Sequence, residues 1–520
     1  MKTIHGMVLA AAALTASPAR AQESGAFVLR VAGRDTIAVE TFRRAPGEVR
    51  GEIAITGRAR VAYTLRISDA LVPLGMEMRA WAPGAPDSAP PLQNVVVTYA
   101  GDSATVAISA GGQRMTQVVR GAAGALPIVN PSALALEQVL MAARRAHADS
   151  ATVPVFTVGT TQAAQARVRF RGDSATVTIG AVVANARTDA AGRLLGAAVP
   201  GQNLSIERVA GASTAMRMDY SAPAGAPYTA EEVRVPHPAG FRLAGTLTLP
   251  KERRGRVPAV ITITGSGLED RDESIPLVAG YRPFRQVADT LGRRGIAVLR
   301  MDDRGYGASE GNGQTATSRD LASDIAAGVA YLRTRPEIDP GRIALVGHSE
   351  GGIIAPMVAA DDPRIRAVVL VAGTSRTGRR ILEYQLRYPL ERDTTLTAAQ
   401  RDSAYRAGWA QVDSMSARMP WLPFFIGYDP LPTARRVRQP VLIVQGETDR
   451  QVTADQAREL DAAIRGAGNR DVTLRVFPQM NHLLIHDPDG MPSGYAKLGR
   501  NQVEPEVLGA IADWLAAKLR

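Results

Sequence analysis

Two patterns of hydrophobic and polar residues divide the chain. From about residue 25 to residue 208, short runs alternate between apolar and polar side chains and are separated by Gly, Asp and Pro. Examples are Glu52-Ile53-Ala54-Ile55-Thr56 and Arg167-Val168-Arg169-Phe170. A period of two predicts strands with one buried face. We therefore expect an antiparallel β-rich domain over residues 22–226, interrupted by one helix at about residues 131–147.

Two segments of this region almost repeat each other. Residues 101–108 and 172–179 both begin Gly-Asp-Ser-Ala-Thr-Val. The repeat predicts equivalent hairpins in the two halves of a sandwich or barrel. A chain this rich in Ala, Thr and Val would also produce such a similarity by chance.

A different pattern follows the Pro-, Gly- and Ala-rich stretch at residues 221–227, which is the best linker candidate. Continuous apolar runs alternate there with helical patterns, which predicts a mainly parallel sheet with helices on both faces over residues 227–520. The expected strands are 259–264, 296–300, 343–346, 367–371, 441–444 and 472–476, and the expected helices are 284–294, 318–334 and 352–360. Residues 374–438 break the alternation with mostly helical sequence, so we expect a helical cap there.

The first 21 residues have the pattern of a secretory signal peptide. Lys2 precedes an apolar run at residues 7–16, and Ala19-Arg20-Ala21 fits a cleavage site. The alternative is a helix of the mature protein. No later stretch approaches about 18 uninterrupted apolar residues, so we expect no integral membrane anchor after cleavage. The sequence thus predicts a periplasmic or extracellular protein.

Composition removes several classes of function. The chain has no cysteine and six scattered histidines, which excludes disulfides and thiolate metal sites and leaves no expected metal or cofactor. The formal net charge is +11. Lysine nevertheless occurs only at four positions, and the arginines are interleaved with Asp and Glu, so we expect no nucleic-acid partner.

The pattern Gly-x-Ser-x-Gly occurs twice, around Ser349 and around Ser309. A nucleophile elbow needs a strand that runs into a tight turn and then a helix. The apolar run at residues 342–346 precedes Ser349, and an apolar helical pattern follows it. Ser309 lies among glycines with no helix directly after it. We therefore predict that Ser349 is the nucleophile and that Ser309 belongs to a loop.

A serine nucleophile needs a base and an acid that orients the base. In this architecture both follow later strands, in the order Ser, acid, His. Asp449 follows the strand at residues 441–444, with Glu447 as the alternative acid. His482 follows the strand at residues 472–476, with His486 as the competing base. The remaining candidates, His237 and His348, are better explained as packing or hydrogen-bonding histidines.

The oxyanion of an acyl-transfer reaction needs backbone N–H donors. The elbow supplies the N–H of Glu350, and an earlier loop must supply a second donor. The glycine-rich loop after the strand at residues 259–264 offers Ser266 as the first choice and Gly267 as the alternative.

Several motifs in this order resemble the EstD-like bacterial carboxylesterases, which are α/β-hydrolases related to the serine aminopeptidase domain. The motifs are Thr264-Gly265-Ser266-Gly267-Leu268-Glu269-Asp270-Arg271-Asp272-Glu273, Arg282-Pro283-Phe284, Asp302-Asp303-Arg304-Gly305-Tyr306-Gly307, Gly347-His348-Ser349-Glu350-Gly351-Gly352 and Tyr428-Asp429-Pro430. The resemblance covers about residues 236–520. It implies an α/β-hydrolase fold, a triad of Ser349, Asp449 and His482, and hydrolysis of carboxylic esters. Leu268 and Glu269 depart from the family pattern.

Together these observations predict a secreted serine hydrolase that acts on a small-molecule ester. We expect Trp421, Phe424 and Phe425 of the cap to form an apolar acyl pocket, and residues 270–272 to brace the loop through an ion pair. The runner-up is a peptidase of the aminopeptidase type, which would need acidic groups for a substrate amine, whereas the cap is rich in arginine. A binding protein with an inactive hydrolase fold is the third reading.

Overall fold

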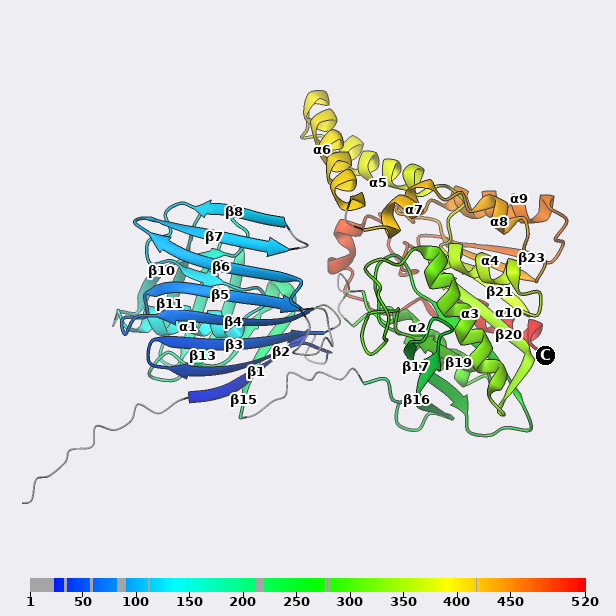
Figure 1. Ribbon diagram of the computed structural model, residues 1–520, viewed down its shortest axis with the longest axis horizontal. Coiled ribbons are helices and arrows are strands. Elements are labelled where there is room, and N and C mark those ends of the chain that lie inside the picture. The colour runs from blue at the N-terminus through cyan, green and yellow to red at the C-terminus, as the bar shows by residue number, and fades with distance from the viewer. Residues whose placement is uncertain are drawn as a thin grey trace, which may run out of the picture. The chain divides into compact units, whose positions relative to one another are not determined.

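A computed structural model describes residues 23–31, 35–56, 59–81, 90–110, 113–146, 148–210, 219–275, 278, 280–417 and 419–520 (Figure 1). The chain divides into two compact units, Met1–Met216 and Arg217–Arg520. The predicted signal peptide lies outside the described residues. None of the helices among the described residues is long and apolar enough to cross a membrane.

The first unit contains a single sheet of 15 strands in the order β8-β7-β6-β5-β4-β3-β2-β1-β15-β14-β13-β12-β11-β10-β9. Neighbouring strands are antiparallel, except that β9 and β10 are parallel. The strands are β1 (Glu23–Val31), β2 (Asp35–Ala45), β3 (Glu48–Ile55), β4 (Ala59–Ile67), β5 (Pro73–Trp81), β6 (Gln93–Ala100), β7 (Ser103–Ala110), β8 (Gln113–Val119), β9 (Leu126–Ile128), β10 (Ser150–Thr157), β11 (Ala164–Arg171), β12 (Ser174–Ile179), β13 (Val182–Thr188), β14 (Leu194–Val199) and β15 (Leu204–Val209), with a short helix η1 (Pro200–Gln202) before β15. The antiparallel β-rich prediction is confirmed.

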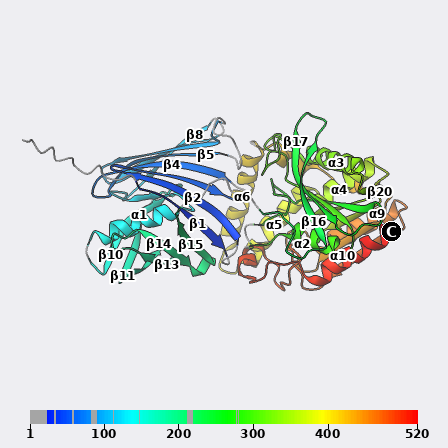
Figure 2. The same ribbon diagram turned by 90° about the horizontal axis from the view of Figure 1, so that it is seen from below.

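Helix α1 (Ala133–Arg144) lies between the two halves of this curved sheet (Figure 2). Its apolar side chains, such as Leu134 and Leu140, share one core with strands from both halves. Ser132 begins the helix, because its side chain accepts a hydrogen bond from the N–H of Ala135. The predicted helix at residues 131–147 is therefore confirmed within a few residues of each end.

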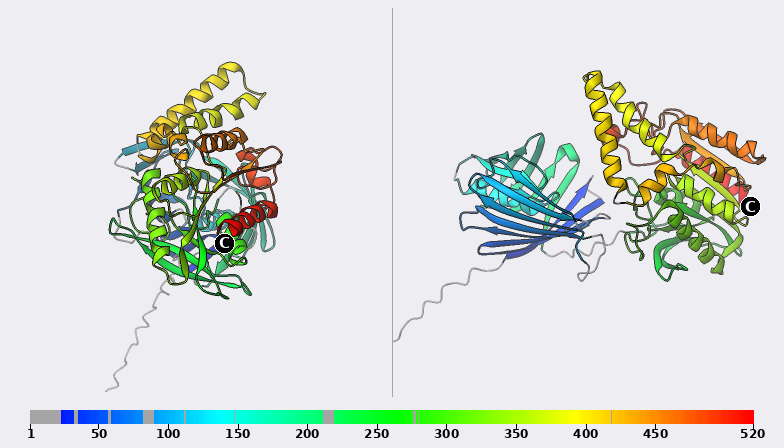
Figure 3. Two further views of the ribbon diagram at one scale, coloured as in Figure 1. Left: turned by 90° about the vertical axis from the view of Figure 1, so that its right-hand side faces the viewer. Right: turned by 45° about the horizontal axis from the view of Figure 1, so that its top comes forward.

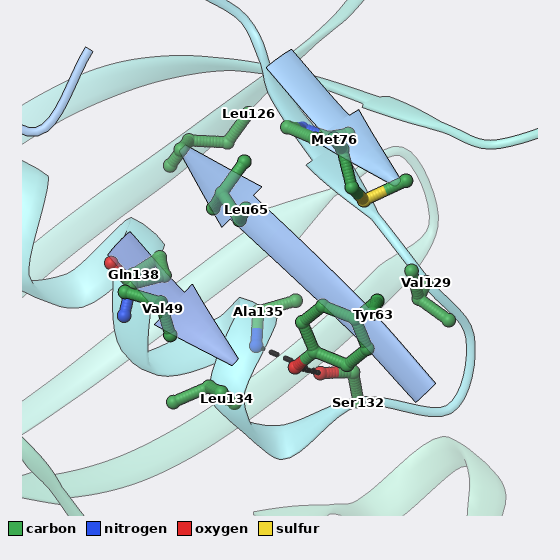
Figure 4. Close-up of a pocket in the computed structure, with 11 residues that line it drawn as sticks. Val49, Tyr63, Leu65, Met76, Leu126, Val129, Ser132, Leu134, Ala135 and Gln138 are labelled. Carbon is green, nitrogen blue, oxygen red and sulfur yellow. Dashed lines mark hydrogen bonds between the residues drawn. The ribbon is translucent and has the colours of Figure 1, made fainter. Parts of the chain in front are cut away.

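The interior around α1 also holds buried polar groups. Glu40 is fully buried and accepts hydrogen bonds from the hydroxyls of Tyr63 and Ser132, each at 2.7 Å. Burial raises the pKa of the Glu40 carboxyl above its ordinary value, although these hydrogen bonds oppose the shift. A cavity of about 10 Å³ lies beside Tyr63, Ser132 and Gln138 (Figure 4). That volume suits one water molecule rather than a substrate.

The two near-repeated segments form hairpins of one continuous sheet, one in each half of its strand order. Gly101 joins β6 to β7 and Gly172 joins β11 to β12, and both have a positive φ, of 59° and 61°. Glycine adopts this left-handed conformation without steric cost. The shared Gly-Asp sequence thus marks two tight turns.

The second unit is built on an eight-stranded sheet in the order β16-β17-β19-β18-β20-β21-β22-β23. The six strands from β19 to β23 in this order are parallel to one another, as predicted, whereas β17 pairs antiparallel with both β16 and β19. The strands are β16 (Tyr228–Pro236), β17 (Arg242–Pro250), β18 (Val257–Ile263), β19 (Ala297–Met301), β20 (Ile338–His348), β21 (Ala367–Val371), β22 (Val441–Gly446) and β23 (Val472–Phe477).

Helices cover both faces of this sheet. The apolar sides of α2 (Pro283–Gly292) and α10 (Pro505–Lys518) form one core with the sheet. Those of α3 (Ser318–Thr334), α4 (Gly351–Asp361) and α9 (Ala454–Gly466) form the other. This layered arrangement confirms the predicted fold class of the second unit.

Four helices lie between β21 and β22, where the cap is expected. They are α5 (Gly378–Arg392), α6 (Ala398–Ser416), α7 (Trp421–Gly427) and α8 (Leu431–Ala434). The views of Figure 3 show α5 and α6 as a helical hairpin that projects from the rest of the second unit. No residue of α6 is buried, whereas Ile381 of α5 belongs to the core of the second unit. A short helix η2 (Pro492–Lys497) precedes α10.

Candidate active site

Ser349 lies in a sharp turn between β20 and α4. Its φ of 53° is unusual for a residue other than glycine and is typical of a nucleophile elbow. The flanking glycines are required by close packing: a Cβ on Gly347 would lie 2.0 Å from the carbonyl oxygen of Gly351, and one on Gly351 would lie 2.2 Å from that of Ile263. The Ser349 N–H donates to the carbonyl of Val371 at 2.9 Å, which fixes the turn against the next strand.

Ser309, the serine of the second Gly-x-Ser-x-Gly pattern, has a structural role. Its hydroxyl donates to the carbonyl of Asp302 at 2.7 Å and accepts from the N–H of Ala244 at 2.8 Å. A hydroxyl that joins a loop to β17 in this way is not free to attack a substrate. The prediction that Ser309 belongs to a loop is confirmed.

Asp449 follows β22 and is fully buried. One carboxylate oxygen accepts from the N–H groups of Gln451 and Val452, both at 2.8 Å. The other accepts from the Gln445 side chain at 2.9 Å and lies 2.7 Å from Nδ1 of His482. Because a carboxylate with these donors is an acceptor, His482 donates to Asp449 from Nδ1, and Nε2 is the ring nitrogen that can act as a base.

His482 and Ser349 line the same pocket. No direct hydrogen bond joins the two side chains in the described structure, which is common in sites without substrate. The competing residues lie elsewhere: His486 is exposed and contacts the Gln479 side chain, and Glu447 is exposed and accepts from the Gln479 N–H. The structure therefore brings Ser349, His482 and Asp449 to one site.

The pocket has a volume of about 310 Å³. Apolar side chains from the cap form part of its wall, namely Ile381, Leu382, Trp421 and Phe425. Phe424, which was also expected there, is absent from the lining and instead stacks on Tyr428 with ring centroids 5.4 Å apart. The aromatic pocket predicted from the sequence therefore consists of two of the three expected rings.

Three glutamates, Glu269, Glu273 and Glu350, line the pocket, and the lining contains no lysine or arginine. Each glutamate has one buried carboxylate oxygen without a hydrogen bond to a described residue. Burial, with the negative charges of Glu273 and Asp303, raises the pKa of Glu269 well above its ordinary value. The lining of the pocket therefore contains acidic and no basic side chains, although the cap is rich in arginine.

Glu350 connects the elbow to the cap. Its Oε1 accepts from the Ser318 hydroxyl at 2.5 Å and from the indole N–H of Trp421 at 2.7 Å. Trp421 in turn stacks on Phe425 with ring centroids 5.2 Å apart. Burial raises the pKa of the Glu350 carboxyl above its ordinary value, although the hydrogen bonds from Ser318, Trp421 and Ser266 oppose the shift. Sequence analysis missed this bond between α7 and the elbow.

The candidate oxyanion donors differ in their positions. Ser266 and Glu350 line the pocket, whereas Gly267 does not. Neither backbone N–H of these two lining residues donates a hydrogen bond to another described residue. The N–H of Gly265 is occupied, because it donates to Glu273 Oε1 at 3.0 Å. Position therefore favours Ser266 over Gly267 as the donor from the loop.

The charged segment at residues 270–272 braces its loop through two separate ion pairs. Arg271 contacts Asp302 through its Nη2 at 2.8 Å, and both side chains are almost completely buried. Asp272 pairs with buried Arg300 of β19. The predicted brace is present, with partners on β19 and the loop that follows it.

Comparisons with known proteins agree with this architecture. A family model described as serine aminopeptidase, S33, matches residues 279–489. Esterase EstD of Thermotoga maritima is 28% identical over 283 residues, which cover 52% of this chain and 65% of EstD. The second unit has an α/β-hydrolase fold and is similar in sequence to EstD. The chain thus spans less than two thirds of the length of that relative.

The hydrolase unit also matches proteins of other descriptions. The uncharacterized peptidase YuxL of Bacillus subtilis is 23% identical over 273 residues, which cover 49% of this chain and 35% of YuxL. A solved structure of the Pyrococcus furiosus esterase Pf2001 aligns with a TM-score of 0.40 and 18% identity, over 58% of this chain and 98% of that one. Among the described residues, no group of three His, Asp or Glu side chains is placed to hold a metal ion.

Proposed function

We propose that the chain is a serine carboxylesterase with Ser349 as nucleophile, His482 as base and Asp449 as the group that orients the base. The observation that carries the proposal is the pairing of His482 Nδ1 with Asp449 at 2.7 Å in a pocket that also contains Ser349. This pairing leaves Nε2 available to take the proton of the serine hydroxyl.

The reaction would proceed by acyl transfer. His482 removes the Ser349 proton as the hydroxyl attacks the ester carbonyl, and the N–H groups of Ser266 and Glu350 stabilise the resulting oxyanion. His482 then protonates the leaving alcohol, and a water molecule releases the acyl group from Ser349 by the same steps. Asp449 stabilises the imidazolium that forms on His482. None of these steps needs a metal or cofactor.

The pocket supports a small-molecule ester as substrate. Its volume of about 310 Å³ lies at the lower end of the range typical of small-ligand sites. The apolar wall from the cap favours short or medium acyl groups. We also propose, from the leader pattern at residues 1–21, that the protein acts in the periplasm or outside the cell.

Labelling with a fluorophosphonate probe, followed by mapping of the modified residue, tests the nucleophile. We expect label on Ser349, and we expect Ser349→Ala to lose both label and aryl-ester hydrolysis, by on the order of a million-fold in turnover. Ser309→Ala is the matched control and should retain both. Label on Ser309, or unchanged hydrolysis in Ser349→Ala, would contradict the proposal.

A peptidase of the aminopeptidase type remains the second candidate because of the pocket charge. The unpaired oxygens of Glu269 and Glu350 lie in the same pocket as Ser349, and a substrate ammonium group would compensate their burial. A panel that pairs each acyl group as an ester and as an amide, with and without a free amine, separates the two candidates. Faster turnover of amine-bearing amides than of esters would favour the peptidase.

A further inference from the structure

A second buried pair of a carboxylate and a histidine lies beside Asp449 and His482. It consists of Glu273, in the loop after β18, and His348, the last residue of β20. Nδ1 of His348 lies 2.6 Å from Oε1 of Glu273, and the two side chains are 7% and 1% exposed. The mechanism proposed above uses neither side chain, and their exclusion from water calls for an explanation.

The hydrogen bonds of His348 define its protonation. Nε2 lies 3.0 Å from the backbone carbonyl oxygen of His482, and a carbonyl oxygen can only accept. Nε2 therefore carries a proton. Nδ1 faces a carboxylate oxygen that also accepts from the N–H of Gly265, so Nδ1 carries a proton as well. With both ring nitrogens donating, His348 is an imidazolium cation paired with the Glu273 carboxylate.

This ion pair connects three parts of the site whose relative positions matter for the reaction: the oxyanion loop, the nucleophile elbow and the backbone of the catalytic base. Through Glu273 it holds the N–H of Gly265, next to the candidate oxyanion donor Ser266. Through His348 it holds the backbone of His482, and His348 itself directly precedes Ser349. A Cβ on Gly265 would lie 3.1 Å from Glu273 Oε1, a tight contact, so a larger residue at position 265 would press on the glutamate of the pair.

We propose that Glu273 and His348 form a positioning pair that fixes the catalytic base and the oxyanion loop around Ser349, and that the His348 cation keeps His482 unprotonated and thus active as a base. The proposal rests on the proposed function, because it assigns these roles relative to the triad. The rings of His348 and His482 have centroids 4.9 Å apart. At that separation two positive charges repel, so a charged His348 disfavours a proton on Nε2 of His482.

Other titratable groups around His348 act on both histidines. The titratable side chains that line the pocket or contact this pair from the neighbouring elements are Glu269, Glu273, Tyr281, Glu350, Asp449, His482 and Tyr495. The carboxylates among them favour protonation of His482, and His348 is the cation that opposes them. Replacing His348 with a neutral side chain therefore removes the positive charge that opposes a proton on His482, whichever of these carboxylates is ionised.

Two neutral replacements separate the contacts of His348. In His348→Asn the side-chain amide reaches the position of Nδ1 and can still donate to Glu273, whereas in His348→Gln it reaches the position of Nε2 and can still donate to the His482 carbonyl. We expect kcat to fall more than tenfold in His348→Asn, with KM within about threefold, and to fall less in His348→Gln. In both variants the acid limb of the kcat/KM profile should move up by about half a pH unit or more, because the cation is lost.

The matched control is His237→Asn, which removes a histidine that contacts Ser323 and Phe241 and does not line the pocket. Its kinetics should equal those of the wild type. A wild type without ester turnover would refute the proposed function and not this pairing. Equal losses in both His348 variants with an unmoved acid limb would overturn the positioning role.

A measurement that needs no enzymatic turnover tests the pairing of Glu273 with His348 even if a variant fails to fold. In ¹⁵N NMR of the wild-type protein labelled at histidine, one imidazole should show both nitrogens protonated at neutral pH. That signal should persist in the presence of a fluorophosphonate adduct on Ser349. A spectrum in which every histidine of the protein is a neutral ring at pH 7 would overturn the assignment of His348 as a cation.

Discussion

His348 makes the stability of the hydrolase unit depend on pH. Burial lowers the pKa of His348, but the charge of Glu273 and the hydrogen bonds to Glu273 and the His482 carbonyl outweigh burial, so its pKa in the folded protein lies above the ordinary value of 6.5. A group whose pKa is raised by folding binds its proton more tightly in the folded state. Its contribution is complete below pH 6.5 and is lost as the pH rises through the folded pKa.

We therefore expect the free energy of unfolding of the wild type to fall, relative to that of His348→Asn, between about pH 6.5 and the raised pKa. The loss is about 1.4 kcal/mol for each unit by which the pKa is raised. Urea unfolding of both proteins at pH 6, 7 and 8 measures it. A difference between the two proteins that grows with pH would contradict the prediction.

Among individual residues, the sequence indicates those whose role follows from their position directly after a strand. The positions of Ser349, Asp449 and His482 could be predicted because each follows an apolar run that forms a strand of the parallel sheet, whereas their roles in catalysis stay a prediction. The partnership of Glu273 could not be predicted, since His348 lies 75 residues away and only folding brings the two together. The sequence shows Glu273 only as the last residue of a charged loop.

Helix α7 is held to the elbow by one hydrogen bond, from Trp421 to Glu350. In Trp421→Phe the ring can still stack on Phe425, but the donor is lost from a buried carboxylate. A hydrogen bond to a charged group contributes about 1.5–3 kcal/mol. We expect kcat/KM for apolar esters to fall about tenfold or more, through a cap that no longer closes the acyl pocket.

Steady-state kinetics with esters of graded chain length checks this expectation. The matched control is Trp409→Phe on α6, which lies outside the pocket lining and should leave the kinetics unchanged. A reduction of the same size in both variants would show that the effect comes from the cap as a whole and not from the bond to Glu350.

Helices and strands whose apolar residues recur with a clear period could be predicted from the sequence. Those whose structure depends on the elements that they pack against could not. The parallel strands and α2, α3 and α4 lie where their apolar spacing indicates. The antiparallel strands β16 and β17 were missed, because nothing local distinguishes an edge strand of this sheet from the preceding β-rich region. On α6, Tyr405 and Trp409 contact Arg387 and Arg379 of the neighbouring α5, a pairing that the spacing of residues within either helix does not reveal.

Across the whole molecule, each unit has its own core, so their stabilities can be changed separately. Glu137 of α1 is fully buried and pairs with Arg44 and Arg208 while accepting the N–H of Leu194 at 2.8 Å. Glu137→Ala leaves two arginines without their buried partner. We expect it to lower the free energy of unfolding of the first unit by about 3–5 kcal/mol.

Thermal unfolding followed by calorimetry, with fluorophosphonate labelling of Ser349 as the readout of the hydrolase unit, tests this separation. The labelling rate below the first transition should equal that of the wild type. Glu207→Ala, which removes an exposed pair with Arg30, is the matched control and should change the unfolding free energy by less than about 1 kcal/mol. A parallel loss of labelling in Glu137→Ala would show that the two units depend on each other.

The α5–α6 hairpin gives the hydrolase unit a segment that tolerates change. Since α6 buries none of its residues and Gly408 touches only Leu386 of α5 closely, its outer positions carry little of the folding energy. Mutations can accumulate there faster than in β20 or the elbow, where a single added methyl group collides with backbone. Sequence change can therefore accumulate on α6 without first having to rescue the fold, and since no residue of α6 lines the pocket, such change should leave the substrate range of the site unaltered.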